Sequence, residues 1–240
     1  MKTVAIIQAR LGSTRLPGKV LLDLAGEPML ARVIHRLRRA QRLDEVVIAT
    51  TTEQRDDALA DLCATRGWAC SRGSENDVLD RYYRAALEAK ANVVVRVTSD
   101  CPLIEPTIVD FVLAELEKTQ ADYASNVGMP RTYPRGLDVE AFPFAILERL
   151  WHEDQNPAWR EHVTEMIHQR PELFRTVNVC HSRDWSQLRW TVDTPEDFEL
   201  IRRIYAHFGS DDFSWEEVLA LIETHPDWIE INSSILQKVI

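Results

Sequence analysis

Apolar residues in the first half of the chain alternate between short continuous runs and longer stretches with helical spacing. Continuous runs of strand length cover residues 3–8, 46–50 and 93–98, as in strands that are buried on both faces. The stretches between them place apolar side chains on one helical face. We expect helices over residues 27–41, 54–66, 106–118 and from Val78 onward. This alternation predicts a mostly parallel central sheet with helices on both faces.

The predicted helix starts carry local signals. Pro28 suits the first turn of the helix over residues 27–41, and Asp77 is a suitable N-cap for a helix that carries Val78 and Tyr82. The segments between residue 8 and the helix at residue 27, and between residue 98 and the helix at residue 106, are therefore expected to be loops at the carboxyl ends of their strands. Open α/β sheets bind their ligands at that edge.

The second half of the chain is less regular. Residues 126–136 contain two prolines and two glycines and are expected to form a loop. We expect strands over residues 137–142, 175–179 and 188–192, with a hairpin between the last two. Further helices are expected over residues 143–152, 158–170, 195–208 and 215–223. With no internal repeat and no Gly/Ser linker, residues 1–240 are interpreted as one α/β domain with a late lobe at about residues 126–192.

Composition narrows the class of protein. Hydrophobic residues make up 45% and charged residues 28% of the 240 positions, which is typical of a globular domain. The formal net charge of −10 argues against a nucleic-acid partner, because such binders usually carry a basic face. No apolar run reaches the ~18 residues of a transmembrane helix, and the first apolar run is too short for a signal peptide. We therefore expect a cytoplasmic protein without a membrane partner. The cysteines and histidines show no metal-ligand spacing, which argues against a structural transition-metal site.

The loop after the first predicted strand is cationic. Residues 1–22 contain no Asp or Glu and carry four cations, namely Lys2, Arg10, Arg15 and Lys19. Glycines let backbone N–H groups approach an anion, and Arg and Lys donate to phosphate oxygens. A Walker A loop does not fit, because five residues separate Gly12 from Gly18 and Val20 follows Lys19. The loop indicates either a polyphosphate site of another kind or a solvated basic loop with turn glycines.

Two aspartates, Asp100 and Asp193, each follow a predicted buried strand. Strand ends in one sheet can bring both carboxylates to the same edge, and Mg²⁺ is commonly held by a few carboxylates together with waters and substrate phosphate oxygens. In the alternative interpretation, Asp100 forms a turn before Pro102, and Asp193 caps the helix that begins near Pro195.

Three segments resemble a known family. Residues 8–19, Gln-Ala-Arg-Leu-Gly-Ser-Thr-Arg-Leu-Pro-Gly-Lys, are similar to the signature loop of the cytidylyltransferases that make CMP-activated acidic sugars, of the spore-coat-polysaccharide and CMP-Kdo synthetase types. Residues 97–104 resemble the metal-binding segment of that family, and residues 190–197 its late Asp-Thr-Pro-Glu-Asp segment. One departure is Thr98-Ser99, where the CMP-Kdo relatives usually carry Gln-Gly.

This resemblance implies a Rossmann-like nucleotide-diphospho-sugar-transferase fold that joins CTP to an acidic sugar with loss of pyrophosphate, using Mg²⁺. Arg10, Arg15 and Lys19 would neutralise the leaving pyrophosphate, with Mg²⁺ on Asp100 and Asp193. We expect Asp100 to be catalytic together with these three cations. The residues expected to bind the nucleotide are Ala9, Arg10, Gly12, Ser13, Lys19, Gly73, Ser74 and Thr98.

The acceptor site is expected in the late lobe. Arg131 and Arg135 could hold an acidic acceptor, and Asp138 or Glu140 could orient a sugar hydroxyl; a mobile surface loop is the alternative. His162 is a further candidate for the same pocket, although a lone histidine on a helix is more often structural.

Outside the predicted site, Arg81 and Arg96 are expected to pair with carboxylates inside the protein. Trp215, Trp228 and residues 229–240 are candidates for a homodimer contact.

Two other functions fit part of the pattern. A glycosyltransferase of the same fold would use a nucleotide-sugar donor, but the usual Asp-x-Asp motif is missing at Asp100. A non-catalytic nucleotide-binding partner protein in polysaccharide assembly would not need Asp100 and Asp193 together with Arg10 and Lys19.

Overall fold

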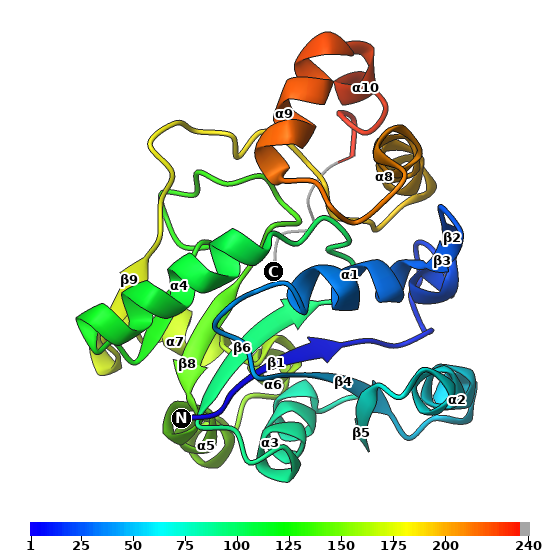
Figure 1. The fold of residues 1–240 in the computed structure, drawn as a ribbon. Coiled ribbons are helices and arrows are strands. Elements are labelled where there is room, and N and C mark those ends of the chain that lie inside the picture. The colour runs from blue at the N-terminus through cyan, green and yellow to red at the C-terminus, as the bar shows by residue number, and fades with distance from the viewer. Residues whose placement is uncertain (236–240) are drawn as a thin grey trace.

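The computed structural model describes residues 1–235 of the chain (Figure 1). Within them, seven strands form a central sheet in the order β5-β4-β1-β6-β8-β7-β9. The strands of the first half run parallel to one another: β1 (Thr3–Gln8), β4 (Glu45–Thr51), β5 (Ala69–Gly73) and β6 (Val93–Thr98). The second half adds β7 (Tyr123–Ser125), β8 (Glu140–Pro143) and β9 (Thr176–Asn178), of which β8 runs antiparallel to β6 and β7. The mostly parallel sheet predicted from the sequence is confirmed.

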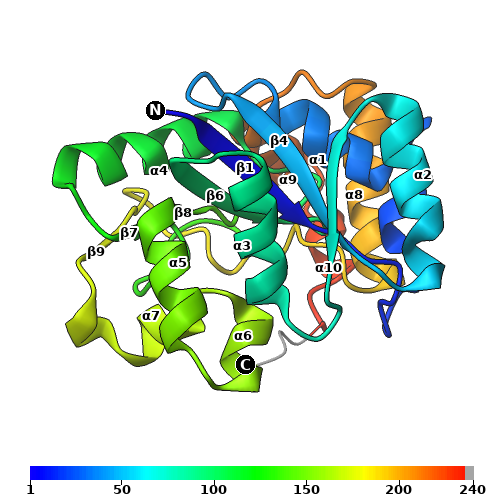
Figure 2. The same cartoon turned by 90° about the horizontal axis from the view of Figure 1, so that it is seen from below.

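Helices cover both faces of this sheet, as Figures 1 and 2 show from two directions. Alternate residues of β1 point into two separate cores, with Val4 and Ile6 in one and Ala5 and Ile7 in the other. One face carries α1 (Met29–Leu37), α2 (Asp57–Arg66), α4 (Pro106–Thr119), α8 (Pro195–Phe208) and α9 (Trp215–Thr224). The other carries α3 (Val78–Glu88), α5 (Phe144–Glu153), α6 (Pro157–His162) and α7 (Glu165–Gln169). The short helices are η1 (Lys19–Leu21), η2 (Gln54–Asp56), η3 (Pro171–Leu173) and α10 (Asp227–Glu230).

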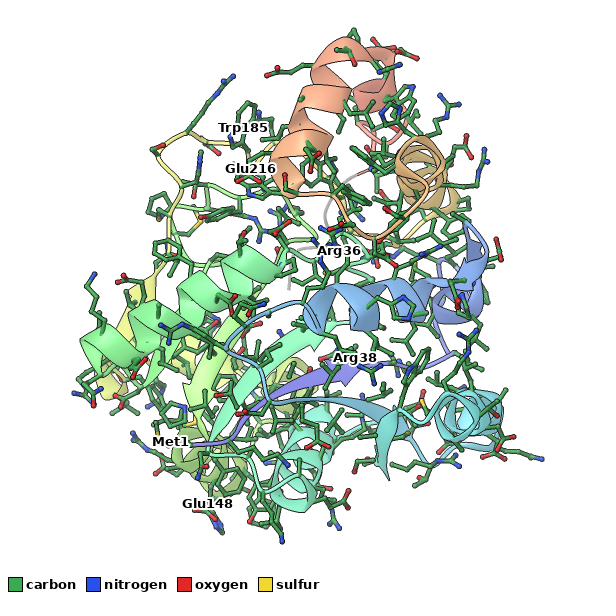
Figure 3. All side chains as sticks on the ribbon, viewed as in Figure 1. Met1, Arg36, Arg38, Glu148, Trp185 and Glu216 are labelled. Atoms are coloured by element: carbon green, nitrogen blue, oxygen red, sulfur yellow. The ribbon has the colours of Figure 1, made fainter. Side chains whose placement is uncertain are left out.

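A buried arginine on α1 holds the connection between α8 and α9 in place. The Arg36 guanidinium donates to the carbonyl oxygens of Ile104, Asp211 and Phe213 at 2.7, 2.9 and 3.0 Å. Glu105 supplies its countercharge at 3.2 Å. In Figure 3 this side chain lies between α1 and the start of α9. Arg36 thereby connects α1 to the segment between α8 and α9.

The helix predicted over residues 27–41 is wrong at both ends. Its first residues form β3 (Glu27–Pro28), which pairs with β2 (Asp23–Leu24) as a hairpin, and the helix ends at Leu37. Ala25 and Gly26 at the hairpin tip have φ of 56° and 88°, and positive φ at both central residues is what a tight hairpin turn requires. Pro28 accordingly caps α1 rather than lying in its first turn.

The second half departs further from the prediction. The helix over residues 158–170 is broken into α6 and α7 at Val163, whose φ is +66°. The predicted hairpin is also wrong, because β9 pairs with β7. Residues 188–192 lie instead against two loops, where Trp190 N donates to Arg135 O at 2.7 Å and Val192 N to Asp100 O at 2.8 Å. Residues 137–139 precede β8 without belonging to it. The expected helix over 215–223 is confirmed, and that over 195–208 is confirmed to the residue.

The two tryptophans that are candidates for a dimer contact differ in how far they are buried. Trp215 is buried against Tyr133 and His181, at ring-centroid distances of 5.6 and 5.3 Å. Trp228 is half-buried, and the last part of the candidate segment 229–240 lies outside the described residues. Among residues 1–235, no helix has the length and apolar character needed to cross a membrane.

Candidate active site

The candidate site lies where β1 and β6 end and where the chain enters α8. A cavity of about 270 Å³ opens there between the loop after β1, the segment after β6, and the helices α3 and α6. It brings together nine of the residues predicted for the site, namely Ala9, Arg10, Gly12, Ser13, Arg15, Lys19, Thr98, Asp100 and His162. The other lining residues are Gln8, Thr14, Glu75, Val78, Arg81, Ser99 and Glu161.

The cationic loop is shaped by its own backbone and by η2. Leu11 O accepts hydrogen bonds from Ser13 N at 2.9 Å and from Gly18 N at 3.1 Å, which closes the loop on itself. Leu11 N donates to Asp56 Oδ1 at 2.7 Å and so anchors the loop to the neighbouring strand connection. Gly18 has a φ of 68° at the start of η1, a conformation that glycine adopts at little cost. The loop therefore enters the cavity with a fixed backbone.

Lys19 lies buried between the two predicted metal ligands. Its Nζ donates to Asp100 Oδ2 at 3.1 Å, to Asp193 Oδ1 at 3.0 Å and to Val192 O at 2.7 Å. Burial acts to lower the pKa of Lys19, but the two carboxylates outweigh it and the net pKa is raised. Lys19 is therefore a charged group inside the protein. The interpretation of the loop as a solvated basic loop does not hold for this residue.

Asp100 closes the same cluster from the end of β6. Burial acts to raise the pKa of Asp100, but the Lys19 ammonium and the Thr98 hydroxyl outweigh it and hold this pKa below its usual value. The Asp100 carbonyl oxygen accepts from Val192 N at 2.8 Å and from Thr191 Oγ1 at 3.2 Å. These backbone contacts bring the segment after β6 to the segment before α8.

Asp193 is surrounded by cations. Besides Lys19, it contacts Arg15 Nη2 at 3.1 Å and Arg189 Nη2 at 3.0 Å. The alternative role of Asp193 as a helix cap is wrong, because the Thr194 side chain accepts from Asp197 N and closes a capping box. The Asp193 carboxylate is thus available to the cluster.

The donor set fits a divalent ion that also uses substrate oxygens. Asp100 and Asp193 each present a carboxylate oxygen to one shared cation, the Lys19 ammonium. Within residues 1–235, no group of three or more His, Cys, Asp and Glu side chains is arranged to hold a metal. Two carboxylates suffice only where phosphate oxygens and waters complete the coordination, as is common for Mg²⁺.

Arg81 was expected to pair with a carboxylate, and the structure gives it a different place. It is 2% exposed, lines the cavity and donates from Nη1 to Ser74 O at 2.6 Å. Its Nε has no hydrogen-bond partner among the described residues. Ser74 Oγ accepts from Asp77 N at 3.1 Å and so belongs to the turn before α3. The helical spacing of Val78, Arg81 and Tyr82 places them on one face of α3, and this spacing is the sequence signal that Arg81 points inward.

Of the acceptor residues predicted in the late lobe, His162 lines the cavity and the other four do not. Arg131 pairs with Asp138 and donates to backbone carbonyls of its own loop. Arg135 lines a second cavity of about 250 Å³ that Arg189 also lines. Glu140 is buried and pairs with Arg96, which confirms Arg96 as the partner of a carboxylate. Neither these residues nor Gly73, Ser74 and Asp193 are among the lining residues of the first cavity.

Comparison with known proteins gives matches along nearly the whole chain. The family model described as Cytidylyltransferase matches residues 4–223. "Uncharacterized protein MJ1063" of Methanocaldococcus jannaschii is 35% identical over 240 residues, which covers 99% of this chain and 97% of that protein. The "Spore coat polysaccharide biosynthesis protein SpsF" of Bacillus subtilis is 35% identical over 230 residues, covering 92% and 94%. A solved cytidylyltransferase from Leptospira borgpetersenii superposes with a TM-score of 0.91 at 33% identity, covering 100% and 99%.

Two further matches are partial or distant. The 3-deoxy-manno-octulosonate cytidylyltransferase of Geobacter sulfurreducens is 41% identical over 126 residues, which is 50% of this chain and 48% of that protein. The structure of Rv0371C from Mycobacterium tuberculosis in complex with manganese shares the fold at a TM-score of 0.60 and 14% identity, covering 85% and 99%.

Proposed function

Because the chain belongs to the cytidylyltransferase family and is therefore a nucleotidyltransferase, we propose that it transfers CMP from CTP to an acidic sugar and releases pyrophosphate. The observation that carries this proposal is the meeting of Arg10, Arg15 and Lys19 with Asp100 around one cavity. The names of two relatives support the class of product, since one acts in spore coat polysaccharide synthesis and the other on 3-deoxy-manno-octulosonate, a sugar carboxylate.

In the proposed reaction an acceptor hydroxyl attacks the α-phosphorus of CTP. The triphosphate lies along the loop of Gly12 and Ser13, where the neighbouring cations neutralise the leaving pyrophosphate. Arg10 pairs with Glu75 at 3.0 Å and Arg15 with Asp193 at 3.1 Å, and the two arginine side chains are 41% and 42% exposed. Both guanidinium groups can therefore exchange their carboxylate partners for phosphate oxygens without disturbing buried side chains. Ala9 and Thr98 complete the nucleotide side of the proposed site.

We assign Mg²⁺ to Asp100 and Asp193. When bound, Mg²⁺ supplies charge neutralisation and polarisation at a phosphoryl oxygen. A manganese complex of a protein with the same fold supports a divalent metal in general. Lys19 carries the charge between these two carboxylates and reaches the same space.

For the acceptor, His162 is the predicted residue that lines the cavity, and we keep it as the contact for an anionic group. Arg131 and Asp138 neutralise each other in this structure, and Arg135 lies at the second cavity. We therefore assign the acceptor to the side of the cavity formed by α6.

The test is pyrophosphate release by the purified protein with CTP, Mg²⁺ and a panel of sugar acids, with mass detection of the CMP-sugar. We expect release that requires both CTP and one acceptor class, and that is lost in Asp100→Asn. Consumption of a nucleotide-sugar donor without pyrophosphate would support the glycosyltransferase alternative. Nucleotide binding without turnover on any acceptor would support the non-catalytic one.

A further inference from the structure

The chain between α6 and α7 contains a strained turn beside the cavity. Val163 has φ +66° and ψ −55°, and Thr164 N donates to His162 O at 2.7 Å. This is a γ-turn with positive φ at its centre, a rare and strained form, and it stands here on a β-branched residue. The Val163 side chain is fully buried in the core below the sheet. Strain of this kind persists only where the surroundings hold it.

A buried carboxylate is the group that holds the turn. Thr164 Oγ1 donates to Glu140 Oε2, and both residues are at most 5% exposed. Glu140 is fixed in turn by its ion pair with Arg96 and by Tyr123 Oη, which donates to Oε2 at 2.9 Å. The Glu140 carboxylate therefore has partners from β6, β7 and the turn itself.

The held turn directs side chains into the cavity. Glu161 and His162 line it directly before the turn, on the wall formed by α6. On another wall, Gln8 Oε1 accepts from Arg96 Nη2 at 3.3 Å, so the same ion pair also contacts a residue at the end of β1. The Glu140 carboxylate is therefore linked to the cavity in two ways, through Thr164 and the turn to His162, and through Arg96 to Gln8.

We propose that Glu140 and Thr164 are positioning residues, which hold the γ-turn at Val163 so that His162 faces the anionic ligand bound in the cavity. The proposal rests on the proposed function for the identity of that ligand, a nucleotide triphosphate and an acidic acceptor. It also gives Glu140 a role different from the direct sugar contact predicted from the sequence.

Two matched variants separate positioning from simple stability. Thr164→Val removes the hydroxyl that links the turn to Glu140 and keeps a β-branched side chain. Tyr123→Phe removes a different hydroxyl from the same carboxylate oxygen and leaves the turn linked. Both lose one hydrogen bond to Glu140, and Tyr123→Phe also loses the contact of its hydroxyl with His168 Nε2 at 3.3 Å. We expect both to lower the melting temperature by a few degrees. We expect only Thr164→Val to lower kcat, by about tenfold, and Thr164→Ser to restore it.

A second readout does not depend on turnover. The imidazole NMR resonance of His162, assigned with His162→Gln, is followed while CTP and Mg²⁺ are added. We expect it to shift in the wild-type protein and in Tyr123→Phe, and to shift less in Thr164→Val. Should Thr164→Val fail to fold, Thr164→Ala removes the same hydroxyl without the second methyl group.

The outcomes are distinguishable. An unmoved His162 resonance in the wild-type protein, or equal kinetics and equal shifts in Thr164→Val and Tyr123→Phe, would overturn the positioning role. A shift that is present in the wild-type protein and weakened in Thr164→Val, without pyrophosphate release on any acceptor, would support positioning and reject the proposed function.

Discussion

Two of the clusters in which acidic and basic side chains meet, one in the sheet and one at the active site, are built differently. In the sheet cluster (Arg96, Glu140, Tyr123 and Thr164), one carboxylate is matched by one guanidinium, and hydroxyl groups donate to the same carboxylate. In the active-site cluster (Lys19, Asp100, Asp193, Arg15 and Arg189), one ammonium is shared by two carboxylates, and one of these carboxylates contacts two more cations. In the first cluster one charge matches one charge, although Arg96 Nε has no hydrogen-bond partner among residues 1–235. In the second cluster Arg189 also pairs with Asp197 at 2.8 Å, so three cations meet three carboxylates that share partners.

Exposure follows the same division. The Arg96 and Glu140 side chains are 14% and 7% exposed, so water and ligands have little access to them. Arg15 in the active-site cluster is 42% exposed and reaches the cavity. A buried, matched pair is costly to break and offers nothing to a ligand. A cluster whose cations share carboxylates and are partly exposed can exchange an internal partner for a phosphate oxygen. This difference separates a structural from a ligand-binding role.

The largest effect is expected for Asp100→Asn in the active-site cluster. The substitution removes the charge of a proposed metal ligand. We expect it to cost about 4 kcal/mol of transition-state stabilisation, which corresponds to a loss of about 1000-fold in kcat. The free energy of unfolding should change by only about 1 kcal/mol, because Lys19 keeps Asp193 and the Val192 carbonyl as partners. Pyrophosphate release and urea unfolding measure the two quantities. A large loss of stability with retained activity would make Asp100 a turn former.

A somewhat smaller effect on turnover is expected for Lys19→Met. Removal of one preorganised cation should lower kcat by about 100-fold. The same change removes the positive charge between Asp100 and Asp193, so the nucleotide-free protein should bind Mn²⁺ more tightly than the wild type, as measured by electron paramagnetic resonance. The control is Lys118→Met, since the Lys118 side chain is 73% exposed on α4. Weaker Mn²⁺ binding in Lys19→Met would contradict a metal site at these two carboxylates.

The two clusters also differ in how far the sequence could predict them. Asp100 and Asp193 could be expected to converge, because strand ends of one parallel sheet share an edge. The capping box of α8 is readable in Thr194 and Asp197, so its start was predicted correctly. The burial of Lys19 between the aspartates could not be predicted, because it depends on where three distant segments meet in space.

The sheet cluster shows why prediction failed in the late lobe. Local sequence at Val163 favours continued helix or strand, and the positive φ there is imposed by burial of its side chain and by the contact of Thr164 with Glu140. Tertiary contacts of this kind leave no periodic signal. Apolar and polar residues alternate over positions 188–192 as in a strand. Their backbone hydrogen bonds go to the loops of Arg135 and Asp100, so the alternation alone does not predict the structure here.

Glu140→Gln is expected to change stability in a pH-dependent way. Burial acts to raise the pKa of Glu140, but Arg96 and the hydroxyl donors outweigh it and the net pKa lies below the usual 4.5. The ionised group therefore stabilises the fold fully above pH 4.5, and this stabilisation is lost as the pH falls toward the folded-state pKa. At pH 7 the variant should lose about 2 kcal/mol of unfolding free energy, and the gap to the wild type should close below pH 4.5.

Urea unfolding between pH 7 and pH 3.5 measures this gap. The matched control is Glu148→Gln, because Glu148 is an exposed carboxylate on α5 (Figure 3). We expect the control to follow the wild type at every pH. A gap of constant size for Glu140→Gln down to the lowest pH would mean that lost packing, and not the charge of the sheet cluster, is responsible.

The smallest effect is expected for Ser74→Ala, which tests whether the turn before α3 belongs with the structural or the ligand-binding cluster. The sequence predicts that Ser74 contacts the nucleotide, whereas its Oγ accepts from Asp77 N at 3.1 Å and is absent from the cavity lining. Loss of this turn contact should cost about 1 kcal/mol of unfolding free energy or less. The preference for CTP over UTP should stay within about twofold, because a base site discriminates strongly only through polar groups that touch the base. Melting-temperature shifts with each nucleotide and Mg²⁺ measure the preference. A tenfold loss of the CTP preference would place Ser74 in the base site and extend the ligand-binding region to this turn.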